Sequence, residues 1–213
     1  MAHRESIERE MSYQHYGWFK RRVLRRAETI TTTNALLWGV AWLIISSILC
    51  WYFRLMPTSA LCFTATGYVS LMWSVVLNLV ACMCWAVLFL PLGLVRNPKL
   101  KSNELFSRLL FAHWPVTILL LPAIVGNRTA YTTFMDSPLT AFELYPMFSA
   151  VMTLIVLIVV VWWMMWSYQA ISITTLKNKS VDKLLFAVIA VLGVVLSNVV
   201  TGYVLERAIF LTI

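Results

Sequence analysis

The chain has 213 residues, of which 61% are hydrophobic and only 12% are charged, and its formal net charge is +8. A soluble domain normally carries about 25% charged residues, so this composition excludes a soluble globular protein and predicts an all-α integral membrane protein. The length fits a bundle of five transmembrane helices of roughly 20 residues each, with no sizeable soluble domain. Because the cations lie near the ends of the apolar stretches, they indicate the usual cytoplasmic excess of Lys and Arg and not a nucleic-acid partner.

Residues 1–33 form a basic cytoplasmic N-terminal segment. In the stretch MSYQHYGWFKRRVLRRAETI, apolar and aromatic side chains can share one helical face while cations cover much of the rest. This pattern is typical of an interfacial helix on an anionic membrane surface. The alternative is an ordinary positive flank without a lipid role. The candidate membrane-surface contacts are Trp18, Phe19, Lys20, Arg21, Arg22, Arg25 and Arg26.

Five apolar stretches follow, in a transmembrane domain over residues 34–205, and a short extracytoplasmic tail, 206–213, ends the chain. The third stretch is the shortest and holds Pro115 and Pro122. Broken helices form binding sites in many transporters, but proline is also common in membrane helices as a simple kink, which is the interpretation we favour. The expected spans are about 34–53, 68–94, 109–125, 147–168 and 183–203.

The Lys and Arg residues alternate between the two sides of the predicted bundle. Counted from the N-terminal segment through successive loops to the tail, their numbers are 7, 1, 4, 1, 3 and 1. Loops rich in Lys and Arg stay in the cytoplasm. The series therefore predicts a cytoplasmic N-terminus and an extracytoplasmic C-terminus, and a missed or additional span would break the alternation.

The ionisable residues give no sign of catalysis or of a cofactor. All nine Asp and Glu residues lie in loops or at span ends, whereas ion-driven carriers usually keep an ionisable group in mid-bilayer. Haem ligation needs histidines inside the spans, and only His113 lies near one, where we expect it at the membrane interface. We therefore expect no enzymatic activity, no metal and no cofactor.

The four cysteines match no zinc or haem spacing. Cys82 and Cys84 are two residues apart in the second span and point in different directions on a helix, so we expect them to be apolar filler. Cys50 lies near the end of the first span and Cys62 in the loop after it, and a disulfide between them is left open.

The polar residues within the spans are the candidates for helix packing or for lining a path. Asn198 is the strongly polar side chain deep in the fifth span, and Ser197 and Thr201 lie beside it. Small and polar residues at such spacing often mediate contacts between membrane helices. Asn78 in the second span is the candidate partner of Asn198 across the bundle, and the other interpretation is that these residues line a substrate path.

The second half of the chain, about residues 99–203, has a recognisable outline. Its third span opens with KLKSNELFSRLLFAHWPVTILLLPAIVG, and its fourth and fifth are joined as WWMMWSYQAISITTLKNKSVDKLLFAVIAVLGVV, in which a tryptophan and a tyrosine lead into a basic turn. This outline resembles the Yip family, the Ypt-interacting five-span membrane proteins. The resemblance implies a non-enzymatic protein; eukaryotic relatives are linked to Rab-type GTPases and vesicle traffic, and bacterial ones are accessory or envelope proteins. It assigns no binding residues.

The function we expect is that of a non-catalytic accessory or scaffold subunit of a membrane transport or trafficking system. It would pack against another membrane protein or a second copy through its Trp-rich fourth span and the small-residue face of its fifth. The second hypothesis is a small transporter or channel subunit with a polar path near Asn78 and Asn198, and a weaker third is a lipid-modifying enzyme. We expect a multi-pass protein of the bacterial inner membrane, or of an endomembrane in a eukaryote.

Overall fold

The structure is a computed structural model, which describes residues 27, 30–59, 61–65, 70–96, 101–175 and 180–212. In this part of the chain, five helical stretches are long and apolar enough to cross a membrane, as the sequence predicts. The seven candidate membrane-surface residues, Trp18 to Arg26, lie outside the described residues. The five stretches are Thr32–Phe53, Leu71–Pro91, Ser102–Val125, Pro146–Ser172 and Lys183–Leu205.

Four of the spans belong to single long helices. These helices are apolar on nearly all sides, which suits a lipid environment because a helix satisfies its own backbone hydrogen bonds. The second of them contains Pro91 and continues to Arg96. The four helices are α3 (Thr32–Phe53), α4 (Leu71–Arg96), α9 (Pro146–Thr175) and α10 (Ser180–Thr212).

The third span is built from three pieces, α5 (Ser102–Ala112), η2 (Trp114–Leu120) and α6 (Leu121–Val125). It begins at Ser102, before the expected start at residue 109, and so includes Arg108. That guanidinium is buried, contacts Glu104 at 3.2 Å and donates a hydrogen bond to the Ala27 carbonyl at 3.0 Å. Because its charge is paired and hydrogen-bonded inside the bundle, Arg108 does not stop the helix.

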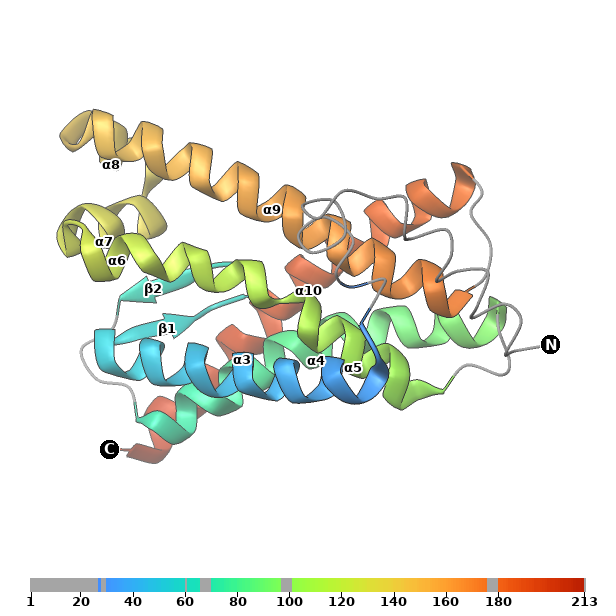
Figure 1. Ribbon diagram of the computed structural model, residues 1–213. Helices are drawn as coiled ribbons and strands as arrows, with labels where there is room; N and C mark the ends of the chain where they lie inside the picture. The colour runs from blue at the N-terminus through green and yellow to red at the C-terminus, as the bar shows by residue number, and fades with distance from the viewer. Residues whose placement is uncertain are drawn as a thin grey trace.

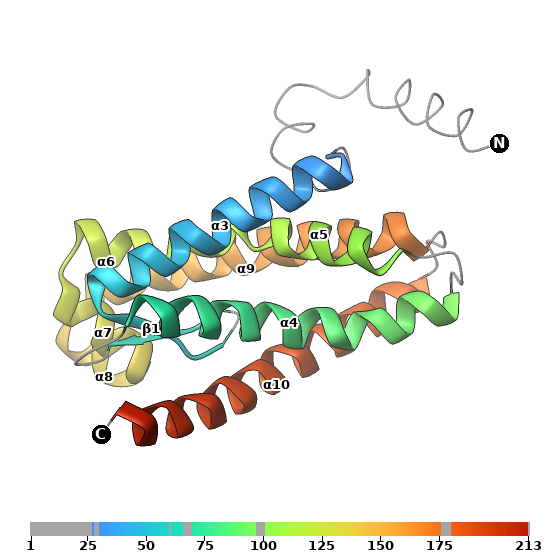
Figure 2. The same cartoon turned by 90° about the horizontal axis from the view of Figure 1, so that it is seen from below.

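The helices pack as an elongated bundle in which α10 lies along α4, and α3 lies against α4 and α5 (Figures 1 and 2). The helix α9 packs against α5 and η2. As an odd number of spans requires, α3 begins at one end of the bundle and α10 finishes at the other (Figure 1).

One end of the bundle, which we call the hairpin end, carries short elements that the sequence did not predict (Figure 1). The strands β1 (Leu55–Pro57) and β2 (Phe63–Ala65) pair antiparallel, with Met56 opposite Thr64. Arg54 ends α3 in the left-handed conformation, at φ 53°, and so turns the chain into β1. The fold is therefore an all-α bundle, as the sequence predicts, with one small hairpin added at this end.

Two short helices, α7 (Arg128–Asp136) and α8 (Pro138–Leu144), complete the hairpin end. The Asn127 side chain caps α7 by accepting a hydrogen bond from the backbone N–H of Ala130 at 3.2 Å. Tyr131 of α7 is fully buried in the same core cluster as Leu55 and Phe63 of the hairpin, and burial raises the pKa of its phenol. These contacts join the loop elements to the bundle.

Candidate functional site

The polar residues singled out from the sequence do not meet at one place. Asn78 is buried in α4, and its Nδ2 donates hydrogen bonds to the Ser47 hydroxyl of α3 at 3.2 Å and to the Ser74 carbonyl at 3.0 Å. Asn198 lies on the exposed side of α10. The expected contact between Asn78 and Asn198 is absent from the described part of the chain, and so is a polar path that both would line.

Ser197 and Thr201 lie on the buried side of α10. The Ser197 hydroxyl donates to the Val194 carbonyl at 2.9 Å. The Thr201 hydroxyl contacts the carbonyl of Ser197 at 2.6 Å and that of Thr58 in the hairpin loop. Thr201 therefore joins α10 to the hairpin end, so the small-residue face of the fifth span is used within the chain.

Asn198 borders a shallow hollow of about 310 Å³ on the outside of α10, which it lines with Val199, Gly202 and Tyr203. Its side chain makes no hydrogen bond with any described residue. A Cβ atom added to Gly202 would meet nothing within 4 Å. This part of α10 therefore presents a free amide beside open space.

His113 lies inside the bundle and not at its surface, which corrects the expected interfacial position. It is the twelfth of the 24 residues of the third span and is 1% exposed. Its Nδ1 donates to the Leu109 carbonyl at 2.8 Å, and its ring centroid is 5.1 Å from that of Trp42. The expectation was wrong because the span begins earlier than its apolar pattern suggests.

The cysteines are all free thiols in this structure, including Cys50, which is buried, and Cys62, which is exposed. The Sγ of Cys82 lies 3.8 Å from the Nδ1 of His113. Among the described residues, no three His, Cys, Asp or Glu side chains gather as a metal site would require.

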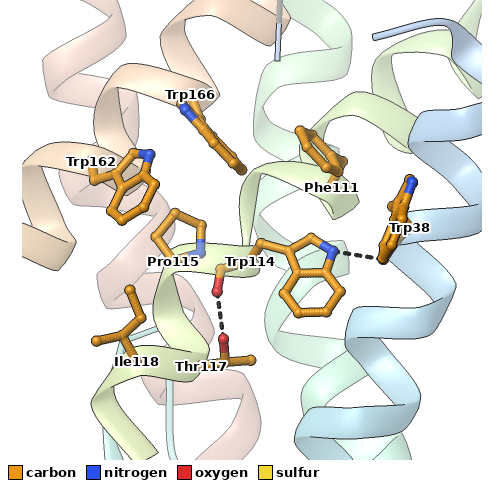
Figure 3. A pocket seen from close by; sticks show the side chains of 8 residues that line it. All are labelled: Trp38, Phe111, Trp114, Pro115, Thr117, Ile118, Trp162 and Trp166. Carbon is orange, nitrogen blue, oxygen red and sulfur yellow. Dashed lines mark hydrogen bonds between the residues drawn. The ribbon is translucent and has the colours of Figure 1, made fainter. Parts of the chain in front are cut away.

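An aromatic groove lies between α3 and α9, about midway along the third span (Figure 3). Its volume is about 380 Å³. Four of its eight lining residues are tryptophans, and most of the others are also apolar. The lining consists of Trp38, Phe111, Trp114, Pro115, Thr117, Ile118, Trp162 and Trp166.

The floor of the aromatic groove exists because the third span is not a regular helix there. Pro115 lies in the first turn of η2, which is a 3₁₀ helix, narrower than an α-helix. Without a backbone N–H, Pro115 cannot continue the α-helical hydrogen bonding of α5. The narrow segment leaves space between its neighbours, and the Thr117 hydroxyl donates to the Trp114 carbonyl at 2.6 Å.

The wall toward α3 is held by a hydrogen bond across two helices. The Trp114 Nε1 donates to the backbone carbonyl of Trp38 at 2.8 Å, and the two indole rings meet edge to face with centroids 6.0 Å apart. Figure 3 shows this bond on the α3 side of the groove. Trp38 is 52% exposed, so the groove opens at the outer surface of the bundle.

The wall toward α9 is formed by Trp162 and Trp166. The Trp166 ring stacks on Phe111 of α5, with centroids 4.9 Å apart and ring planes 10° apart. The Trp162 ring lies edge to face with Trp166 at 5.6 Å. The Nε1 of Trp162 is buried and has no hydrogen-bond partner among the described residues.

The sequence predicted the Trp-rich fourth span as an outward packing surface, but its indole rings point into the bundle and the groove. Trp163 and Trp166 are buried, while the exposed side of α9 is aliphatic, with residues such as Leu154 and Val161. Nothing in the sequence indicated this direction, because tryptophans in the last third of an expected span, 147–168, are also typical of the membrane interface.

Comparison with known proteins gave no match among family models, curated proteins or solved structures.

Proposed function

We propose that this multi-pass membrane protein is a non-catalytic accessory or scaffold subunit that binds a second membrane protein through α10. The observation that carries the proposal is the exposed amide of Asn198 beside the open space at Gly202. Asn198 is the sixteenth of the 23 residues of the fifth span, so its amide lies within the apolar part of the helix and not at its end.

An amide that faces lipid lacks the hydrogen-bond partners that water would offer. In membranes such groups promote helix association by bonding to polar groups of a neighbouring helix, and small residues let the two backbones approach closely. Asn198 and Gly202 are one helical turn apart and supply both features on one side of α10. The partner that fits is therefore a transmembrane helix with an amide or hydroxyl group at this depth.

The packing within the chain narrows the surface on which this partner is expected. The buried side of α10 holds Gly193, Ser197 and Thr201. Gly193 lies against Trp85 of α4, and Thr201 contacts the hairpin loop. The tryptophans of α9 are turned inward. Among the surfaces that the sequence suggested for packing against a partner, the edge of α10 at Asn198 is the polar surface that stays free in the described structure.

The orientation we propose places the hairpin end outside the cytoplasm. In the described part of the chain, the hairpin end carries Arg54 and Arg128, whereas Lys101 and Lys183 lie toward the other end. The N-terminal segment and the loops after the second and fourth spans are richer in Lys and Arg. Membership of the Yip family rests on the outline of residues 99–203 and stays part of this proposal, as does the bacterial inner membrane or a eukaryotic endomembrane.

The test is site-specific photo-cross-linking in native membranes, read by mass spectrometry. A benzophenone side chain at position 199, adjacent to Asn198, should capture a distinct membrane protein. The matched control is position 184, which is similarly exposed on the same helix (Val199 65%, Leu184 70%) but near its other end, and which should not capture this protein.

The variants Asn198→Leu and Asn198→Gln separate the amide from the surface around it. One hydrogen bond between membrane helices contributes about 0.6 kcal/mol on average and up to about 1.7. We therefore expect Asn198→Leu to lower the yield of the adduct by about threefold to twentyfold, and Asn198→Gln to retain it. Adducts with lipid alone, or with a second copy of this chain alone, would contradict an accessory role.

A further inference from the structure

The short helix α8, which lies at the hairpin end between the third and fourth spans, has an apolar side and a polar side. Leu139 and Phe142 are three residues apart and so share one side of the helix, where they are 81% and 42% exposed. Thr140 and Glu143, also three residues apart, are exposed on the next side. Ala141 is fully buried on the side that packs against the rest of the hairpin end. The exposed surface of α8 is therefore amphipathic.

Aromatic residues mark the level at which the bundle leaves the membrane at this end. Trp and Tyr gather at membrane–water interfaces. The exposed Trp51 and Tyr52 lie in the last turn of the first span, and the exposed Tyr203 is third from the end of the fifth. The half-buried Tyr145 follows α8 directly, just before the fourth span begins at Pro146. The ends of these spans lie together at the hairpin end (Figure 1), so α8 lies at the depth of the interface.

The apolar side of α8 is continuous with a surface that faces lipid. Met147, in the first turn of α9, is 81% exposed, and the exposed side of that span is aliphatic from there on, with residues such as Val151 and Leu154. Phe142 is held in place by α7, because its ring centroid is 6.4 Å from that of Phe134. An amphipathic helix at this depth buries its apolar side in the boundary between headgroups and acyl chains.

The charges of α8 indicate which force would hold it there. Its sequence, PLTAFEL, contains no Lys or Arg and includes the acidic Glu143. Attraction to anionic headgroups, which polybasic segments use, is therefore not available to this helix. Apolar contact with lipid is the interaction that its exposed side chains offer.

We propose that α8 is an interfacial helix that inserts Leu139 and Phe142 into the lipid leaflet at the hairpin end and keeps Thr140 and Glu143 in water. The inserted surface includes no residue of α10. It is therefore independent of the partner that we propose for Asn198, and either proposal can fail without the other.

The test measures the depth of nitroxide side chains in the purified full-length protein, with one copy in each phosphatidylcholine nanodisc. Each nitroxide is attached to a single introduced cysteine, in a background in which the exposed Cys62 and the partly exposed Cys84 are replaced by serine. Relaxation of the nitroxide by oxygen reports the acyl-chain region, where oxygen concentrates. Relaxation by a water-soluble nickel complex reports exposure to water.

We expect labels at Leu139→Cys and Phe142→Cys to be relaxed more by oxygen than by nickel. Labels at Thr140→Cys and Glu143→Cys should show the reverse order, and they are the matched controls because each lies one residue from an inserted position. Adding phosphatidylglycerol to the nanodiscs should leave all four depths unchanged, since α8 has no cation to attract it.

Two outcomes would overturn the proposal. One is stronger relaxation by nickel at all four positions, because the apolar side would then lie in water, as a surface for a soluble protein partner would. The other is protection of Leu139→Cys from both reagents, because protein and not lipid would then cover it. Unfolding temperatures show whether each labelled variant is folded. Leu139, at 81% exposure, tolerates a label and decides the result if Phe142→Cys loses its contact with Phe134.

Discussion

Two places where helices of this bundle meet use tryptophan in different ways. Between α4 and α10, the Trp85 ring is fully buried and lies against Gly193, where an added Cβ would come within 2.2 Å of the ring. Between α3 and α9, Trp38 and Trp162 border an open groove of about 380 Å³. Large aromatic rings are present in both places, but only the contact between α4 and α10 is closely packed.

The positions of the glycines explain part of this difference. Gly193 faces Trp85 and lets α10 approach the ring closely. On α3, Gly39 is the neighbour of Trp38 in the chain, but it faces Leu110 of α5, whose Cγ would be 2.8 Å from an added Cβ. The glycine of α3 thus lets α5 approach, whereas the groove is kept open by the break at Pro115 and by the rings of its walls.

The largest effect is expected for a Trp→Ala substitution between α4 and α10, when it is compared with the same substitution at the groove. Trp85→Ala removes a fully buried ring whose centroid is 4.4 Å from that of Trp163, and Trp→Ala in a packed core costs about 3–5 kcal/mol. We expect a marked fall in the unfolding temperature in nanodiscs. Trp38→Ala at the half-exposed edge of the groove should have a much smaller effect, and equal losses would show that the two regions are packed alike.

A smaller effect is expected when the close contact is overfilled. Gly193→Ala places a methyl group against the Trp85 ring, which neighbouring side chains hold in position, and overpacking of a core typically costs about 1–3 kcal/mol. Thermal unfolding in nanodiscs measures this cost. Gly202→Ala on the same helix is the control, because an added Cβ there meets nothing within 4 Å. A wild-type unfolding temperature for Gly193→Ala would mean that α10 does not rest on Trp85.

The number of spans was predictable because it depends on local composition alone, but the start of the third span was not. Arg108 reads as the end of an apolar stretch, and only its contacts with Glu104 and the Ala27 carbonyl allow it inside. The hairpin was missed for a similar reason. Its strands have three residues each. They are held because Leu55 and Phe63 are buried in a core cluster with residues that are distant in sequence, such as Tyr131.

The directions in which the candidate polar side chains point could not be derived from the sequence. A helix that is apolar on every side gives no sign of which face is buried, so nothing in the pattern separated the exposed Asn198 from the buried Ser197 next to it. The groove was missed because it combines residues of distant segments, Trp38, Trp114 and Trp162. The prolines of the third span predicted a kink in the helix. Whether a kink leaves open space depends on the side chains that surround it, and these come from other spans.

The smallest expected effect concerns the groove itself. Trp114→Phe keeps an aromatic ring in the wall but removes the N–H that donates to the Trp38 carbonyl at 2.8 Å. That carbonyl lies within α3, where the helix itself supplies a backbone donor, so the loss should be near the average of about 0.6 kcal/mol for a hydrogen bond between membrane helices. Thermal unfolding beside the exposed control Trp51→Phe can resolve it. A loss as large as that of Trp85→Ala would show instead that Trp114 supports the bundle as a core residue, and the groove would then be a by-product of its packing and not a site that the fold keeps open.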